Sequence, residues 1–156
     1  MNIKFQKLHE SAVIPVSITA AAGGMDVTCT SIEKKANDFY VAKLGFATEI
    51  PEGYRFIIVP RSSLTGTHWV MQNSPGLIDS DYRGEWQMRF RGIPIGIDGS
   101  KPVSENPIIY EDFPFKEGDR IGQIYLEQVI PVTFEEVDSL QNSDRGSSGF
   151  GSTGKS

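Results

Sequence analysis

Asp79 lies in the segment 76–85, where an apolar pair leads directly into an acidic turn and then into Tyr, Arg and Gly. A carboxylate at the end of a strand can orient or deprotonate a water molecule, so Asp79 is a candidate general base. Asp79 and Asp81 also have the spacing of a D-x-D metal site. An Asp-rich turn before a strand is common, and this segment taken alone favours that structural role.

The segment 60–64 (Pro-Arg-Ser-Ser-Leu) places an Arg and two hydroxyls where an apolar strand is expected to end. Arg, Ser hydroxyls and loop amides together suit a phosphate site. Ser is also well suited to be the N-cap of a helix. The segment therefore predicts an anion site, a helix start, or both.

Arg120 and Gln123 stand at the start of a late strand, in the segment 118–123. Residues three apart on a strand point to opposite faces, so we expect different roles for these two side chains. The alternative for Arg120 is a structural ion pair with an acidic neighbour.

The C-terminal segment 145–156 contains a full match to the phosphate-loop pattern G-x-x-x-x-G-K-[ST], from Gly149 to Ser156. A true phosphate loop follows a strand and opens a helix, and we expect no helix after Ser156. A P-loop ATPase is therefore not expected. Phe150 is the only large apolar residue here and can stack on a base, with a gain of ~1–3 kcal/mol. The alternative is a disordered tail of chance composition.

Composition narrows the class of protein. The chain has 156 residues, 38% of them hydrophobic and 22% charged, which predicts one globular domain. No apolar run approaches the ~20 residues of a membrane helix. Residues 1–5 lack the apolar block of a signal peptide, and the single Cys29 favours a reducing cytoplasm, so we expect a cytoplasmic protein. Two His and one Cys exclude an ordinary zinc cluster. The net charge of −5 argues against broad nucleic-acid binding but allows a polyphosphate ligand with a divalent cation.

The elements that position these side chains are predicted to be strands. We expect strands over 3–8, 41–46, 54–59, 85–90 and 121–130, and one helical turn after Pro60. The strand 54–59 is apolar enough to be buried on both faces, and Trp86, Met88 and Phe90 share one face of their strand. Short strands with regular turn signals predict an all-β jelly roll or closed barrel.

Two segments stand apart from these strands. Residues 91–115 include four Pro, which predicts an elaborated hairpin or surface excursion. From residue 141 onward there is one Phe and no aliphatic side chain, so this part cannot join a core. We therefore expect a β domain over 1–140 and a flexible arm over 141–156.

Together with Gly24-Met-Asp-Val27, these segments have the order and spacing of the five motifs of the trimeric dUTPase family, which the chain resembles from Gly24 to Ser156. The resemblance implies a jelly-roll β-barrel, assembled as a homotrimer with active sites between subunits and a flexible C-terminal arm. It implies hydrolysis of dUTP to dUMP and pyrophosphate by Mg²⁺-assisted attack of water on the α-phosphorus. This reaction limits uracil in DNA and supplies dUMP for dTMP synthesis, in the cytoplasm or, for a viral member, in that of the host.

The resemblance also implies roles for single residues. Asp79 matches the catalytic carboxylate that activates water, and Gln123 matches a residue that helps to position it. Ser62 matches the hydroxyl near the α–β bridge, and Arg61 and Ser63 complete that phosphate loop.

Asp26 matches the acid of the first motif, near the metal-bound triphosphate and linked to it through water or through structural contacts. No direct protein ligand for Mg²⁺ is expected, because the triphosphate would hold the ion. A hairpin from Asn73 to Gln87 would bind uracil largely through backbone groups, which reject a base with the wrong edge. Tyr82 would pack under deoxyribose, and Phe150 of the arm would cover the base. The expected substrate-binding residues of the hairpin and arm are Asn73, Gly76, Leu77, Ile78, Tyr82, Gln87, Arg145, Phe150, Gly151, Ser152 and Thr153.

The chain departs from the usual motifs at three positions, with Ser63 in place of Gly, Gly122 in place of Ala and Val27 in place of Leu. The segment 91–115 is longer than the family needs, which suggests a surface for a regulatory protein partner. Neither a membrane nor a nucleic-acid partner is expected.

The closest alternative is a dCTP deaminase, which shares the fold and the Arg-Ser-Ser-Leu loop. Such deaminases carry a catalytic Glu ten residues after the acid that Asp79 matches, and here that residue is Arg89. A further Arg is expected five residues after Arg61, and here it is Gly66. Both differences argue against deamination.

Overall fold

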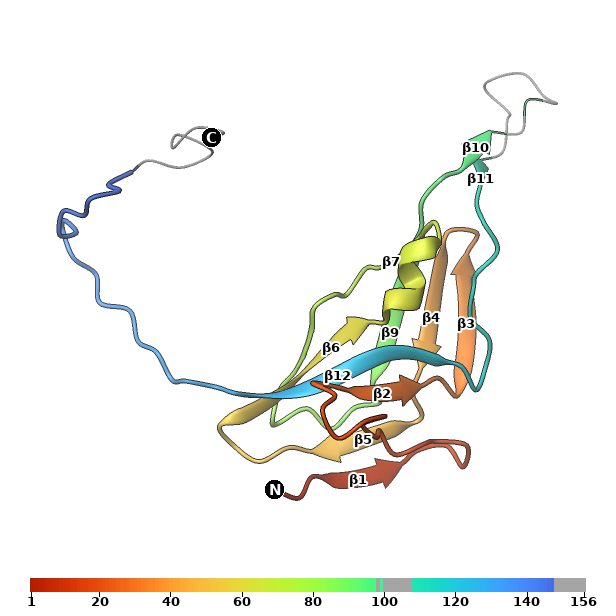
Figure 1. Ribbon diagram of the computed structural model, residues 1–156, viewed down its shortest axis with the longest axis horizontal. Coiled ribbons are helices and arrows are strands. Elements are labelled where there is room, and N and C mark those ends of the chain that lie inside the picture. The colour runs from red at the N-terminus through yellow and green to blue at the C-terminus, as the bar shows by residue number, and fades with distance from the viewer. Residues whose placement is uncertain (98, 100–107, 148–156) are drawn as a thin grey trace.

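The computed structural model describes residues 1–97, 99 and 108–147, and within them the chain is built from strands (Figure 1). One sheet has the order β2-β12-β6-β8, a second has the order β3-β4-β9-β7, and two strand pairs, β1-β5 and β10-β11, complete the fold. The strands are β1 (Lys4–Lys7), β2 (Met25–Thr28), β3 (Ser31–Ala36), β4 (Phe39–Lys43), β5 (Phe46–Glu49), β6 (Tyr54–Pro60), β7 (Trp69–Met71), β8 (Gly76–Ile78), β9 (Gln87–Gly92), β10 (Gly96–Ile97), β11 (Ile108–Ile109) and β12 (Arg120–Gln128). All pairings are antiparallel. The predicted all-β class is confirmed.

Strands β6 and β9 form as their patterns predict. The three central residues of β6, Phe56, Ile57 and Ile58, are 4%, 4% and 0% exposed. Because successive side chains of a strand point to opposite faces, this strand is buried on both faces, as predicted. Trp86, Met88 and Phe90 are 1%, 0% and 0% exposed, so the alternation along 85–90 does mark a core face. The two strands carry much of the core that holds the site in place.

The expected strand over 41–46 is wrong, because the chain turns at Gly45 between β4 and β5. Gly45 has φ +71°, and a Cβ at this position would lie 2.6 Å from Cγ2 of Thr30. Because apolar residues stand on both sides of Gly45, the hydrophobic pattern does not indicate this turn.

One helical turn follows β6, as expected, in the form of the 3₁₀ helix η1 (Ser62–Gly66). Its N-cap is Arg61, in extended backbone, and no side chain caps it. The Ser N-cap prediction is therefore wrong, and both Ser hydroxyls stay exposed on the surface.

The segment 91–115 forms a hairpin whose base is the β10-β11 pair, and Figure 1 shows this pair projecting from the sheets. Its last part returns to the core. The ring of Phe113 stacks on Tyr40 with the centroids 4.4 Å apart, and the indole N–H of Trp69 donates to the carbonyl of Glu111 at 3.1 Å. The excursion is therefore anchored at its C-terminal end.

After β12 the chain leaves the sheets (Figure 1). The amide of Val129 donates to the carbonyl of Gly53 at 2.8 Å, and every residue from 129 to 147 is exposed, including Phe134 at 98%. No helix in the described ranges is long and apolar enough to cross a membrane.

Candidate active site

Asp26 on β2 is a buried carboxylate that gathers three side chains. Its Oδ2 accepts from Nη1 of Arg120 at 3.0 Å, and its Oδ1 accepts from Nε2 of Gln123 at 3.0 Å. Nε of Arg61 lies 3.5 Å from Oδ1. The side chain of Asp26 is 3% exposed, whereas those of Arg61 and Arg120 are 29% and 48% exposed. One buried anion therefore orients two partly exposed guanidinium groups, which offsets the cost of burying its own charge.

Arg120 and Gln123 converge on Asp26, so the expectation that they point to opposite faces is wrong. The pairing of β12 with β2 shifts register between Arg120 and Gly122, because Arg120 pairs with Thr28 and Gly122 already pairs with Val27. A bulge of this kind adds one residue to one strand and breaks the alternation of side chains. Glycine inside a strand is the sequence signal that could have predicted it. The alternative of an ion pair for Arg120 is confirmed.

The segment that follows β6 adds further donors to this cluster. Nη1 of Arg61 donates to the carbonyl of Arg120 at 3.2 Å, which fixes the guanidinium beside the start of β12. Ser62 and Ser63 come next on η1, and both are exposed. Guanidinium groups and hydroxyls held at one place are well suited to bind phosphate oxygens.

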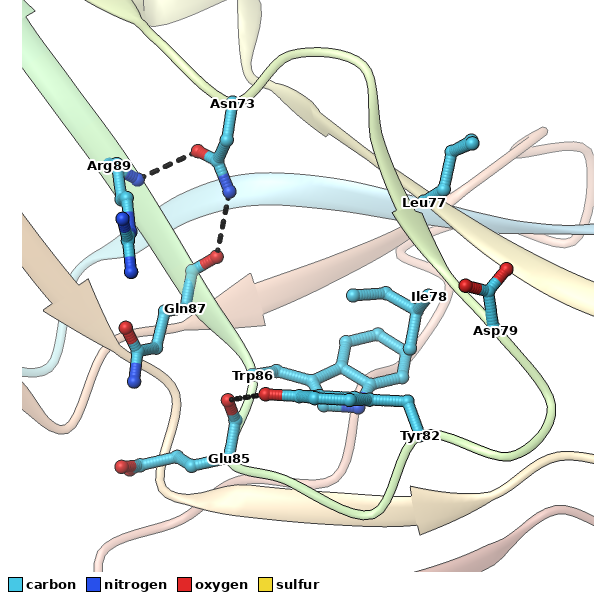
Figure 2. A pocket seen from close by; sticks show the side chains of 9 residues that line it. All are labelled: Asn73, Leu77, Ile78, Asp79, Tyr82, Glu85, Trp86, Gln87 and Arg89. Carbon is cyan, nitrogen blue, oxygen red and sulfur yellow. Dashed lines mark hydrogen bonds between the residues drawn. The ribbon is translucent and has the colours of Figure 1, made fainter.

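A pocket of about 400 Å³ lies between β8 and β9 (Figure 2). This volume lies within the range of small-molecule sites. Six of the predicted residues line it, namely Asn73, Leu77, Ile78, Asp79, Tyr82 and Gln87. Glu85, Trp86 and Arg89 also line it and were not predicted as site residues, although their strand was.

Asn73 fixes the geometry of the pocket through both ends of its amide. Nδ2 donates to the carbonyl of Gln87 at 3.2 Å, and Oδ1 accepts from the amide of Arg89 at 2.8 Å (Figure 2). These bonds tie the segment before β8 to the backbone of β9. The predicted base contact of Asn73 stays a prediction, and the structure gives the side chain a bracing role.

Asp79 sits at the end of β8, at the start of a turn that is held by its own hydrogen bonds. The amide of Tyr82 donates to the carbonyl of Asp79 at 3.2 Å, and Nη1 of Arg83 donates to the carbonyl of Ser80 at 2.6 Å. The hydroxyl of Tyr82 donates to the carbonyl of Glu85 at 3.0 Å. Asp79 itself is exposed and faces the pocket, so the segment is both an acidic turn and a candidate reactive site.

Gly76 allows β8 to approach its neighbours closely. A Cβ here would lie 2.5 Å from Cγ2 of Ile58 and 2.9 Å from the carbonyl of Asn73. We expect Gly76→Ala to lower the free energy of unfolding by about 1–3 kcal/mol, because backbone has to shift to admit the methyl group. Gly96→Ala in β10, where no atom lies within 4 Å of the added Cβ, is the matched control. Urea denaturation of both variants measures the difference, and equal stabilities would contradict the prediction.

The three departures from the family motifs, at Ser63, Gly122 and Val27, have plain structural settings. A Cβ at Gly122 would lie 2.5 Å from Sδ and Cε of Met88, so the Met88 thioether occupies the space that an Ala methyl would need. Val27 is fully buried in the core, and Ser63 is exposed.

The two clusters lie far apart within one chain. Ile78, directly before Asp79, pairs with Phe56 of β6, whereas Gln123 pairs with Val59. Three residues correspond to about 10 Å along a strand, and β8 and β12 lie on opposite sides of β6, which adds about 10 Å across the sheet. Asp79 and Gln123 of one chain therefore cannot contact the same water molecule.

The predicted arm residues are only partly described. Arg145 is exposed in a bend of the segment after β12, whereas Phe150, Gly151, Ser152 and Thr153 lie outside the described residues. Among the described residues, no group of three or more His, Cys, Asp or Glu side chains could hold a metal ion.

The fold and the two clusters define an all-β protein with a basic anion site and a separate pocket edged by an exposed carboxylate. The family model for dUTPase matches residues 10–91 and 109–154. The deoxyuridine 5'-triphosphate nucleotidohydrolase of Wolinella succinogenes is 38% identical, over 100% of this chain and 96% of that protein. The enzyme of the same name from Helicobacter hepaticus is 40% identical, over 99% of this chain and 89% of that protein. The chain belongs to the dUTPase family.

The solved structure of the Staphylococcus bacteriophage 80alpha dUTPase with dUpNHpp is also similar. Its TM-score is 0.72 at 24% identity, and the match covers 99% of both chains. At this identity the likeness shows the fold, which is the jelly-roll-like β fold of the dUTPases.

Proposed function

We propose that this protein hydrolyses dUTP to dUMP and pyrophosphate. The observation that carries the proposal is the pocket between β8 and β9, in which the exposed carboxylate of Asp79 stands at the end of a braced hairpin. Membership in the dUTPase family supplies the substrate class. The reaction limits uracil in DNA and supplies dUMP for dTMP synthesis, and we place it in the cytoplasm.

In the proposed reaction, the oxygen of a water molecule attacks the α-phosphorus and the bond from that phosphorus to the pyrophosphate oxygen breaks. Asp79 orients the water and takes up its proton, and pyrophosphate leaves with the electron pair of the broken bond. The Ser62 hydroxyl would donate a hydrogen bond near the α–β bridging oxygen, where negative charge grows. Arg61, Ser63 and a Gln123 that helps to position the water would complete this half of the site.

The base would bind at the edge of β8. This strand is the last in the order β2-β12-β6-β8, so the backbone edge that faces away from β6 has no partner strand among the described residues. Rigid donors and acceptors of this kind can match the edge of uracil, and the opposite pattern of cytosine would leave them unpaired. Leu77 and the Tyr82 ring would contact the sugar, with Gly76, Ile78, Asn73 and Gln87 around the base.

Mg²⁺ would be held by the triphosphate of the substrate. Both oxygens of the Asp26 carboxylate are engaged by cationic or amide donors, so Asp26 is better suited to a contact through water than to a direct metal bond. When bound, Mg²⁺ neutralises part of the phosphate charge. The two guanidinium groups on Asp26 would then supply the remaining positive charge.

The active form is proposed to be a homotrimer whose sites lie between subunits. The support is the distance of about 10 Å along and about 10 Å across the sheet between Asp79 and Gln123 of one chain. A second copy would bring its Arg61 loop and Gln123 to the first copy's pocket. The arm over 141–156, with the domain over 1–140 as its base, would close on this shared site with Arg145, Phe150, Gly151, Ser152 and Thr153.

Mixing two inactive variants tests the shared site. Asp79→Asn and Ser62→Ala chains are each expected to be nearly inactive alone. In a cyclic trimer every mixed assembly contains one site with both intact residues, so random mixing at equal amounts restores about a quarter of wild-type turnover. Steady-state turnover after co-refolding of the two variants measures this. A mixture no more active than its separate components would contradict the shared site.

We also propose that the hairpin of segment 91–115 contacts another protein. Its described residues expose a cluster of isoleucines, namely Ile93, Ile95, Ile97, Ile108 and Ile109, at 41% to 61%. Apolar side chains gathered on a projecting element are typical of an interaction surface.

Replacing 96–108 by Asn-Gly tests the role of this hairpin and leaves Phe113 in the core. Turnover of dUTP is expected to stay unchanged, because the anchoring contacts of Phe113 and Trp69 lie outside the deletion. A collapse of turnover would mean that the segment supports the active site instead.

A further inference from the structure

Arg89 on β9 lines the pocket between β8 and β9 and takes no part in the proposed reaction. Of the nine described residues that line this pocket, it is the only one with a positively charged side chain, in company with the carboxylates of Asp79 and Glu85. Its guanidinium group makes no hydrogen bond or ion pair with the rest of the described chain, and the residue is exposed. The group is therefore available to donate to a bound molecule.

The backbone of Arg89 is held in place from two sides. Its amide donates to Oδ1 of Asn73 at 2.8 Å, and the amide of Gln72 donates to its carbonyl at 2.7 Å. In the sheet it pairs with Val41 of β4. The guanidinium group therefore reaches the pocket from a braced point of β9.

Arg89 and Asp79 stand on opposite sides of the pocket, and Asn73 and Gln87 lie on the side of Arg89 (Figure 2). In the proposed function, Asp79 marks the end that holds the α-phosphorus. Deoxyribose is attached to N1 of uracil, and the ring atom opposite N1 is C4. The C4 carbonyl is therefore the part of the base that points away from the phosphates, toward the side of Arg89.

We propose that the guanidinium group of Arg89 donates a hydrogen bond to the C4 carbonyl of uracil and thereby selects uracil over cytosine. A guanidinium group is only a donor, and a carbonyl oxygen is only an acceptor. Cytosine carries an amino group at C4, so two donors would face each other and both would stay unpaired. The backbone edge of β8 would contact the rest of the base. This inference deepens the proposed function and rests on it.

Calorimetric binding of dUMP and dCMP to the full-length protein tests the contact without turnover. Arg89→Met keeps a long unbranched side chain but removes the donors. We expect the Kd for dUMP to rise at least about tenfold, as for loss of a hydrogen bond to a charged group. The Kd for dCMP should not rise, so the preference for uracil falls by the same factor.

Arg91→Met is the matched control. Arg91 is the next residue on the same face of β9, but it does not line the pocket, and its Nη1 donates to Oδ2 of Asp38 at 2.6 Å. This variant should leave the Kd values for both nucleotides unchanged.

Two sulfur analogues identify the atom that the guanidinium group contacts. The first, 4-thio-dUMP, has sulfur at C4 in place of oxygen, and 2-thio-dUMP has it at C2; sulfur is a weak acceptor. The 4-thio change should weaken binding to the wild type more than to Arg89→Met, because the variant has already lost the contact. The 2-thio change should have the same effect on both proteins. This double comparison separates a direct contact from a change in pocket shape.

Three results would overturn the proposal. An equal rise in Kd for dUMP and dCMP in Arg89→Met would place the guanidinium group on the phosphate that both nucleotides share. An unchanged Kd for dUMP, or a 4-thio effect of the same size in both proteins, would remove the contact with C4. If the wild type still hydrolyses dUTP, only this inference fails. A wild type that neither binds dUMP nor hydrolyses dUTP would overturn the proposed function as well.

Discussion

Asp79→Asn is expected to lower kcat for dUTP by about 10²–10⁴-fold, the usual contribution of a positioned general base. The amide has the shape of the carboxylate but cannot take up a proton from water. Within the described residues the Asp79 carboxylate makes no hydrogen bond or ion pair, so the substitution removes no contact that supports the fold. Stability and the Kd for a non-hydrolysable dUTP analogue should therefore stay close to those of the wild type.

Asp81→Asn is the matched control, two residues further along the same turn and also exposed. Its turnover should stay near that of the wild type if only Asp79 acts as the base. Parallel losses in both variants, with weaker Mg²⁺ dependence, would favour the D-x-D metal site. Near-normal turnover in Asp79→Asn would remove this residue from its proposed role.

The strands that carry the site could be predicted because their patterns are simple. The run over 54–59 is apolar on every residue but Tyr54 and Arg55, and the run over 85–90 alternates, so both give their burial directly. Each pattern reports only contacts perpendicular to its own strand. What a strand pairs with, and at which register, is set by residues far away in the chain.

The sequence-based predictions that are wrong concern places where one residue changes the path of the backbone. Gly45 ends β4 inside an apolar run, and a bulge next to Gly122 turns Arg120 toward the same carboxylate as Gln123. Both glycines are visible in the sequence. Their effect depends on partners such as Thr30 and Thr28, which no local pattern identifies.

The partners of Asp26 in the candidate site could not be predicted from local sequence either. Its carboxylate could be placed near a phosphate ligand by resemblance, but its partners are Arg61, which directly follows β6, and Arg120 and Gln123 of β12, which lie on either side of the bulge in the pairing with β2. A buried carboxylate with two guanidinium groups is a preorganised anion site, because the geometry is fixed before a ligand arrives. The sequence shows these residues, whereas only the sheet order β2-β12-β6 brings them together.

Truncation after residue 144 is expected to leave the melting temperature within about 1 °C of the full chain, because side chains outside the core contribute little to the free energy of unfolding. All residues from 129 to 147 are exposed. The same truncation should lower kcat/KM for dUTP by at least about tenfold. Loss of the proposed Phe150 stack alone would correspond to ~1–3 kcal/mol, and each 1.4 kcal/mol is about tenfold. Loss of the arm's phosphate donors and of water exclusion adds to this.

Phe150→Ala in the full chain separates the parts of this effect. It removes the proposed stack and keeps the arm, so its loss of kcat/KM should be smaller than that of the truncation. The difference would measure the proposed phosphate contacts of the other arm residues. Calorimetry and steady-state kinetics on both variants give the two quantities. A truncated protein with a much lower melting temperature and unchanged turnover would contradict this prediction. The arm would then stabilise the assembly without closing the site, and another part of the proposed trimer would have to cover the base.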